Sequence, residues 1–440
     1  MSGIAEILIN LGYTVSGSDL RRTPITERLA SLGAVIYEGH VAANVAGSSV
    51  VVTSSAVNAL NPEVMEARAR KIPVIQRAEM LAELMRLKYG IAVAGMHGKT
   101  TTTSIVAAVL AAGGLDPTVV VGGRVDALGS NARLGKSQYL VAEADESDRS
   151  FLKLSPILSI VTNLDREHMD CYRDMADVES AFVEFMDKVP FYGATTACID
   201  NPLLAAVLPR VKRRVYTYGM AANADFVLRM LPRRAGADAA FSEFEVVSQD
   251  GVMGPFSLHV PGRHNVLNAT AAVAIAVQLE VPVEKIAEGI ASFRGVDRRF
   301  QRKGTVRGVT VVDDYGHHPT EIRATLAAAA ECGFKRIHVL FQPHRYTRTR
   351  DLISEFSTAF EGASTLHLLP IYAASEEPIP GVTAEALVTK IVGPKTTFVP
   401  DFATAVREVA AGAAEGDLII TQGAGNVSQL APLVLEALKG

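Results

Sequence analysis

The sequence GMHGKT at residues 95–100 has the composition of a turn that binds phosphate. It stands between an apolar run at residues 91–94, typical of a strand, and a helix-forming stretch at residues 101–112. Its two glycines let the backbone amides turn toward an anion, and the amino end of the following helix adds positive partial charge. Lys99 can then reach the β- and γ-phosphates, while the Thr100 hydroxyl can ligate Mg²⁺. We therefore predict that the chain handles a nucleoside triphosphate.

Two polar clusters follow predicted strands close to this turn. Residues 143–148, the acidic cluster, hold four carboxylates and follow an apolar run at 139–142, and residues 163–170 follow a strand predicted at 157–162. Neighbouring carboxylates repel one another unless a cation or solvent relieves them, and Mg²⁺ is bound through one or two carboxylates together with phosphate oxygens. The acidic cluster therefore predicts a metal site. His168, in the second cluster, fits a structural role as well as a metal ligand.

A third group of polar residues lies in the last part of the chain, again after predicted strands. The strands are predicted at residues 308–312, 336–341 and 417–421, and the polar segments follow at 313–319, 342–350 and 422–426. Because the carboxyl ends of parallel strands meet at one edge of a sheet, these segments should form one site. Arg345 and Arg348, at a predicted helix start, can bind carboxylate or phosphate in bidentate geometry.

The length of 440 residues predicts two or three domains, and the alternation of strands and helices predicts mostly parallel, doubly wound sheets. We place the domains at residues 1–88, 89–294 and 295–440. A net charge of -4 argues against a nucleic-acid partner, and the short basic stretch at 210–214 reads as a solvated face. The three cysteines are scattered, which favours a reducing compartment, and we expect each to be a small buried residue. No apolar run is long enough to cross a membrane.

The first of these domains begins inside a predicted helix, at residues 1–11. A strand predicted at residues 13–16 leads to Asp19, where nucleotide-binding folds often hold a ribose hydroxyl, and a strand at 49–53 leads to Ser54 and Ser55. No glycine-rich turn precedes the helix, so an incomplete first site is expected.

Several motifs, in order along essentially the whole chain, together resemble the Mur ligase family. They are GMHGKTTT at 95–102, the acidic cluster, DREHMD at 165–170, PGRHNVLN at 261–268, DDYGHHP at 313–319 and HRYTRTR at 344–350. The resemblance implies an α/β protein with a Rossmann-like amino-terminal domain that binds a UDP-substrate, a central P-loop ATPase-like domain and a Rossmann-like carboxy-terminal domain that receives the amino acid. Residues 174–185 lack the lysine that several sibling ligases carbamylate, so none is assigned.

The resemblance also implies roles for individual residues. The expected nucleotide-binding residues are Gly95, His97, Gly98, Lys99, Thr100, Thr101, His264, Asn265, Asn268, Arg299 and Asp314. The expected ligands of Mg²⁺ are Thr100, Glu143 and His168. The expected substrate-binding residues are Ser54, Ser55, Tyr315, His317, His344, Arg345 and Arg348. The expected catalytic residues are Lys99, Glu143, His168, Asp314, His317 and His344, and the sequence leaves open whether Asp314, His317 or His344 deprotonates the amine.

The implied activity is ATP-dependent joining of L-alanine to the carboxylate of UDP-N-acetylmuramate through an acyl phosphate, with release of ADP and phosphate. Such an enzyme would serve peptidoglycan synthesis in the cytoplasm as a monomer or weak homodimer, without a membrane or nucleic-acid partner. Two alternatives remain: a recycling ligase that adds a preformed tripeptide, and a non-catalytic module that binds a nucleotide sugar.

Overall fold

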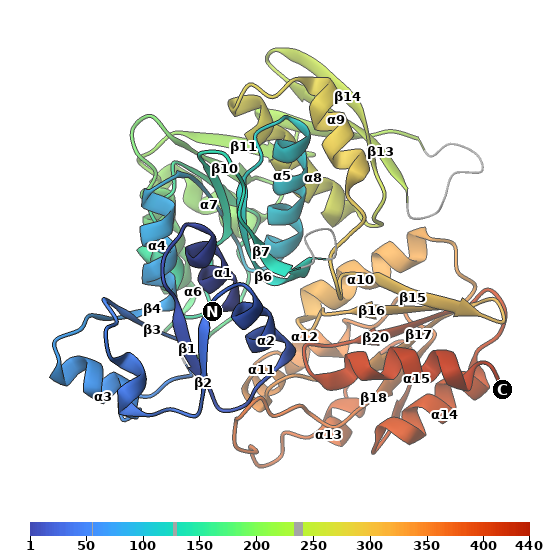
Figure 1. Cartoon of the computed structure of the whole chain (residues 1–440). Helices are drawn as coiled ribbons and strands as arrows, with labels where there is room; N and C mark the ends of the chain where they lie inside the picture. Colours follow the sequence, from blue (N-terminus) through green and yellow to red (C-terminus); the bar gives the residue numbers. More distant parts are fainter. Residues whose placement is uncertain (55, 126–129, 233–240) are drawn as a thin grey trace. The chain divides into compact units, whose positions relative to one another are not determined.

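The computed structural model describes residues 1–54, 56–125, 130–232 and 241–440, which form two compact units. The first unit comprises Met1–Met230, Phe244–Phe256 and Leu267–Ser292. The second comprises Leu231–Glu243, Ser257–Val266 and Phe293–Gly440. Each unit is built on a sheet covered by helices, which confirms the predicted α/β class (Figure 1).

The first unit contains a ten-stranded sheet in the order β14-β13-β12-β11-β10-β9-β5-β8-β6-β7. Its central strands are parallel, whereas β13 and β7 run antiparallel to their neighbours β12 and β6. The strands are β5 (Tyr89–Ala94), β6 (Thr118–Val125), β7 (Ser130–Arg133), β8 (Tyr139–Glu143), β9 (Leu158–Val161), β10 (Ala194–Cys198), β11 (Val215–Gly219), β12 (Phe226–Met230), β13 (Ser242–Ser248) and β14 (Gly251–Leu258). Nearly continuous burial of β5, β8 and β9 explains their unbroken apolar runs, because a central parallel strand is covered on both faces.

The helices that accompany this sheet are α5 (Lys99–Ala112), α6 (Met175–Met186), α7 (Pro202–Val207), α8 (Arg263–Gln278) and α9 (Val283–Ser292). Helix α5 starts at Lys99, two residues earlier than predicted, because the left-handed Gly98 (φ +82°) directly precedes its first turn. Helix α9 packs closely on α5: a Cβ at Gly289 would lie 2.5 Å from the Cα of Val109. The core therefore fixes the helix that begins at the predicted phosphate turn.

The amino-terminal part of the first unit contains two separate two-stranded parallel sheets, β1-β2 and β3-β4. Its elements are α1 (Ser2–Asn10), β1 (Ser16–Asp19), α2 (Pro24–Ser31), β2 (Val35–Glu38), β3 (Val51–Thr53), α3 (Pro62–Ala69), β4 (Val74–Gln76) and α4 (Arg77–Arg86). The prediction of a strand at residues 13–16 was wrong, because pairing with β2 runs from Ser16 to Asp19. Asp19 thus lies within the strand and not beyond its end.

The second unit contains a six-stranded sheet in the order β15-β16-β20-β17-β18-β19. The strands are β15 (Gln301–Val306), β16 (Val309–Asp314), β17 (Ile337–Phe341), β18 (Thr365–Leu368), β19 (Lys395–Phe398) and β20 (Leu418–Gln422), and all neighbours are parallel except β15 and β16. The helices are α10 (Pro319–Glu331), α11 (Tyr346–Asp351), α12 (Ile353–Ser357), α13 (Ala384–Val388), α14 (Phe402–Gly412) and α15 (Leu430–Ala437). Two hydrophobic clusters, one around Phe341 and one around Leu340, cover the two faces of this sheet.

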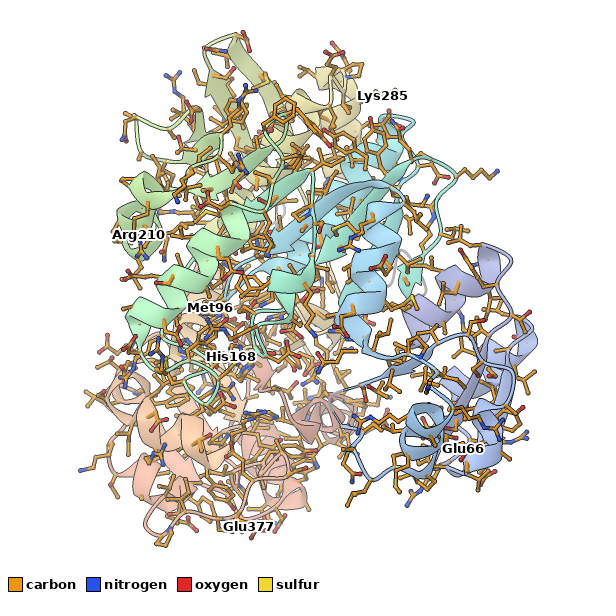
Figure 2. All side chains as sticks on the ribbon, turned by 90° about the vertical axis from the view of Figure 1, so that its left-hand side faces the viewer. Glu66, Met96, His168, Arg210, Lys285 and Glu377 are labelled. Atoms are coloured by element: carbon orange, nitrogen blue, oxygen red, sulfur yellow. The ribbon has the colours of Figure 1, made fainter. Side chains whose placement is uncertain are left out.

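Three further expectations concern the basic stretch, the cysteines and membrane-spanning helices. Arg210 and its basic neighbours at 212–214 are exposed, as predicted for a solvated face (Figure 2). Cys198 is buried, but Cys171 and Cys332 are only partly buried, because one lies in a loop and the other ends helix α10. Across the described ranges, the helices are too short or too polar to span a bilayer.

Candidate active site

The predicted phosphate turn at residues 95–98 joins strand β5 to helix α5 and is braced by the end of strand β9. The backbone N–H of His97 donates to Asn163 Oδ1 at 2.9 Å, and the Asn163 amide donates back to the carbonyl of His97 at 3.0 Å. A side chain at Gly95, whose φ is +129°, would collide with the Thr162 hydroxyl. The turn therefore needs glycine at position 95 and is held in place by hydrogen bonds to Asn163, which follows strand β9.

Lys99 points back over this turn and forms a buried ion pair. Its Nζ lies 2.8 Å from Glu146 Oε1 and donates to the carbonyl of Gly95 at 2.9 Å. Burial works against the ammonium form, but the carboxylates of Glu146 and Glu143 outweigh it and raise the pKa of Lys99. A fixed positive charge thus stands at the turn, where phosphate oxygens would gather.

The acidic cluster divides into two pairs with different roles. Glu143 and Glu146 face the turn, since Glu143 accepts the Thr100 hydroxyl at 2.9 Å and Glu146 binds Lys99. Asp145 and Asp148 shape the loop by accepting backbone N–H groups at 3.0 and 2.9 Å. Glu146 is the member of the cluster that the sequence could not single out. Its spacing from the strand end gives no signal, because the loop decides which carboxylates turn inward.

Glu146 is almost completely buried, with 1% exposure, and links the acidic cluster to the loop that carries His168. His168 Nε2 lies 3.5 Å from Glu146 Oε1, and the Tyr172 hydroxyl donates to the Glu146 carbonyl at 2.7 Å. Glu146 Oε2 has no hydrogen-bond partner among the described residues. Met96 and His168 mark the turn and this loop in Figure 2. A buried carboxylate oxygen without a donor suits a cation, so the residues present fit a metal ion.

The motif at residues 261–268 is split between the two units. In the first unit, Asn268 reaches the phosphate turn: a Cβ at Gly98 would lie 2.9 Å from Asn268 Oδ1. In the second unit, the Asn265 amide donates to the Pro261 carbonyl at 2.7 Å. His264, next to it, is exposed to solvent. The structure thus brings Asn268 to the turn, and Asn265 lies three positions before it on the same helix α8.

The three predicted strand ends of the second unit meet at one edge of its sheet. Asp314 of β16 and Phe341 of β17 both pair with Gln422 of β20. Asp314 is buried, and its carboxylate accepts hydrogen bonds from the backbone of Phe300 and Gly316, both at 2.8 Å, and from the Thr325 hydroxyl at 3.0 Å. Asp314 therefore organises the loops around it.

Tyr315, directly after Asp314, contacts two arginines through its ring. The guanidinium carbons of Arg298 and Arg299 lie 5.0 and 5.1 Å from the centre of its ring. On its edge stands His317, whose ring centre is 5.4 Å from that of Tyr315 and 5.8 Å from that of His344. Arg299 thus reaches the predicted substrate residues through Tyr315.

His344, Arg345 and Arg348 lie together where β17 leads into α11, as predicted. The Arg348 guanidinium donates to the His344 carbonyl at 2.9 Å, and Arg345 Nη1 lies 3.9 Å from Glu376 Oε1. The ring of His344 stacks on Tyr372 with centres 5.5 Å apart and planes tilted by 11°. Tyr372 and Glu376 were not found from the sequence, since nothing in their spacing ties them to residues some thirty positions earlier.

The amino-terminal candidates are less well defined. Ser54 follows β3 and its carbonyl accepts the N–H of Val57, whereas Ser55 lies outside the described residues. A polar group missed by the sequence surrounds Ser18 of β1: its hydroxyl lies 2.6 Å from Glu63 Oε2 and 2.8 Å from His40 Nδ1. The sequence offered one indication of this group. His40 follows strand β2, and in nucleotide-binding folds a residue after the second strand often contacts the ligand.

Three family models match successive parts of the chain. Residues 1–89 match "Mur ligase family, catalytic domain", residues 93–276 match "Mur ligase middle domain", and residues 298–425 match "Mur ligase, glutamate ligase domain". Together the matches cover most of the sequence in the order that the motifs indicate.

Named relatives and solved structures agree with these models. The chain is 72% identical to the UDP-N-acetylmuramate--L-alanine ligase of Acidobacterium capsulatum and 63% identical to that of Koribacter versatilis, covering 100% of this chain and 95% of each relative. The crystal structure of UDP-N-acetylmuramate-alanine ligase from Thermotoga maritima matches with a TM-score of 0.78 at 28% identity, covering 99% of this chain and 96% of that one. A murein peptide ligase from Psychrobacter arcticus shares the fold, with a TM-score of 0.69 at 23% identity over 100% of this chain and 96% of that one.

Proposed function

The chain belongs to the Mur ligase family, and we propose that it joins L-alanine to the carboxylate of UDP-N-acetylmuramate, converting ATP to ADP and phosphate. The observation that carries this proposal is the identity of 72%, along the whole chain, to a relative named for that reaction. The phosphate turn and the face around His344 support it, because they supply the two kinds of site that such a ligase needs.

A carboxylate is a poor acyl donor, so the first step must activate it. A carboxylate oxygen of the substrate attacks the γ-phosphorus, the bond from that phosphorus to the β–γ bridging oxygen breaks, and ADP leaves. Lys99 stabilises this step by offsetting charge on the β- and γ-phosphates. Since Lys99 is paired with Glu146 at 2.8 Å, phosphate oxygens must compete with that carboxylate for the ammonium group.

The same residues fit a magnesium ion. Thr100 and Glu143 offer a hydroxyl and a carboxylate 2.9 Å apart, and Glu146 offers a buried oxygen without a donor among the described residues. Such hard oxygen ligands are those that Mg²⁺ prefers, and His168 stands beside them. When bound, the ion would neutralise negative charge on the phosphates.

In the second step the amino group of alanine attacks the carbonyl carbon of the acyl phosphate, and phosphate leaves as the tetrahedral intermediate collapses. The amine must also lose a proton to a base. We assign this base to His317 or His344, because four hydrogen bonds already engage the carboxylate of Asp314. Arg345 and Arg348 suit the carboxylate of the incoming amino acid.

We place the first 88 residues as the part that receives the UDP moiety, with Ser18, His40 and Ser54 facing it. We further place the reaction in the cytoplasm, where ATP is supplied, and expect a monomer or a weak homodimer, which light scattering after size-exclusion chromatography will distinguish.

The test is phosphate release from ATP and magnesium in the presence of UDP-N-acetylmuramate, with the product identified by mass spectrometry. Free L-alanine should support release and give a product heavier by one alanyl residue. Release with a preformed tripeptide but not with alanine would assign a recycling ligase instead. Binding of the nucleotide sugar without release under either condition would leave a module that only binds. Chelation of the metal should stop the reaction, and added Mg²⁺ should restore it.

A further inference from the structure

The turn that carries His344 and Arg345 has a strained backbone. Arg345 has φ +73° and ψ 138°, a conformation that side-chain-bearing residues rarely adopt. Such a conformation persists only where the surrounding structure holds it in place. The residues that hold this turn are therefore informative about what it is for.

Residues 371–376, which we term the bracing segment, provide much of that support. The Arg345 N–H donates to the Tyr372 carbonyl at 2.9 Å, and the Tyr372 N–H donates to the Pro343 carbonyl at 2.8 Å. These two bonds make a parallel bridge between His344 and Tyr372. The strained residue is thus bonded to the bracing segment on one side, while α11 begins on its other side.

The side chain of Tyr372 also stacks on the imidazole of His344. The two rings are nearly parallel, with centres 5.5 Å apart. Gly425 packs against the base of the tyrosine side chain, because an added Cβ there would lie 2.8 Å from Tyr372 Cγ and 2.5 Å from Gln342 Oε1. The tyrosine side chain therefore contacts both His344 and Gly425, although Tyr372 retains 39% exposure.

Glu376, at the end of the bracing segment, holds the arginine-bearing helix start. Its carboxylate accepts the N–H and the hydroxyl of Thr347 at 3.0 and 2.6 Å and lies 3.9 Å from Arg345 Nη1. Burial opposes ionisation of this carboxyl, but the bonds from Thr347 outweigh it and lower the pKa of Glu376. An ionised Glu376 restrains one side of the Arg345 guanidinium.

From this geometry we propose that Tyr372 and Glu376 are positioning residues for the incoming amino acid, with Tyr372 orienting His344 and Glu376 orienting Arg345. The proposal rests on the alanine-ligase function proposed above. If a binding group adopts its competent orientation only part of the time, the apparent affinity falls by that fraction. A stacked aromatic pair is strong enough to change such an equilibrium about three- to tenfold.

The kinetic test compares the Michaelis constants for the three substrates. Tyr372→Leu should raise KM for L-alanine about three- to tenfold and leave KM for ATP within about twofold of wild type. Tyr372→Phe should restore the wild-type value, because stacking needs the ring. Gly425→Ala should repeat the defect of Tyr372→Leu by displacing the ring, and Glu376→Gln should also raise KM for alanine selectively. The matched control is Tyr192→Leu. Tyr192 is an exposed tyrosine of the first unit, and its replacement should change none of these Michaelis constants.

A second measurement does not depend on turnover. The ring of Tyr372 shields the imidazole hydrogens of His344, so their NMR signals, assigned with His344→Gln, should move in Tyr372→Leu and stay in Tyr372→Phe. If the wild-type enzyme fails to ligate alanine, the proposed function is overturned. The NMR signals of His344 in the Tyr372 variants would still show whether Tyr372 orients this histidine. An unchanged histidine signal, or an equal rise in all three Michaelis constants, would overturn the proposal for Tyr372.

Discussion

Replacing Lys99 by methionine should damage folding and turnover for two separable reasons. The change leaves Glu146 buried with 1% exposure and without the ammonium group that lies 2.8 Å away. Removing one partner of a buried ion pair costs about 3–5 kcal/mol. His168 Nε2, 3.5 Å from the same carboxylate oxygen, can take up part of the charge, so we expect about 3 kcal/mol. Thermal unfolding of the first unit should then shift down by roughly 6–12 °C.

The effect on catalysis has a different origin and should not be recovered with stability. Loss of one electrostatic stabiliser of the transition state costs about a hundredfold or more in turnover. The double variant Lys99→Met with Glu146→Gln removes both charges and should recover most of the lost stability, because no buried charge remains. Turnover should stay at least about a hundredfold below wild type.

The assays are thermal unfolding followed by fluorescence or calorimetry, and phosphate release under saturating substrates. Lys285→Met is the matched control: Lys285 pairs with Glu288 at 2.6 Å on the surface, and its loss should cost less than about 0.5 kcal/mol. A Lys99→Met protein that melts like wild type would refute the buried ion pair. A double variant with near-normal turnover would refute the role of Lys99 in phosphate chemistry.

Two further predictions concern the turn and the loop beside it. Gly98→Ala should raise KM for ATP about tenfold or more, because position 98 has φ +82° and the new Cβ would lie 2.9 Å from Asn268 Oδ1. The control is Gly114→Ala, at φ +79° with open space around it, which should lower stability and leave nucleotide affinity in titrations unchanged. Equal ATP affinity for both variants would contradict this prediction. Hydrogen bonds from Arg149 lower the pKa of Asp177 to about 2, below the ordinary 3.8, so its carboxylate stabilises the fold above about pH 4 and loses that contribution as pH falls toward 2. Urea midpoints for Asp177→Asn should therefore lie below wild type at pH 6 and approach it at pH 3; a constant gap would show that another group controls this range.

Much of the architecture followed from local pattern. The strand-turn-helix unit around Lys99 was predictable because an apolar run, two glycines and a helix former each act on their own neighbours. The edge formed by β16, β20 and β17 was predictable for a related reason: polar residues after buried parallel strands collect at the same end of a sheet. The strand predicted at residues 13–16 failed because little in that stretch is buried, and pairing with β2 set its position.

The sequence by itself determined the class of chemistry, because glycines, a lysine, carboxylates and arginines at the ends of strands are recognisable by type and spacing. Only the tertiary structure decided which members of each group act together. Glu146 pairs with Lys99, which is 47 positions away in the sequence. Tyr372 stacks on His344 although strand β18 separates the two residues in the sequence. Such pairs depend on how separate loops fold back onto a common sheet edge. That information resides in long-range packing, which no local pattern of residues encodes.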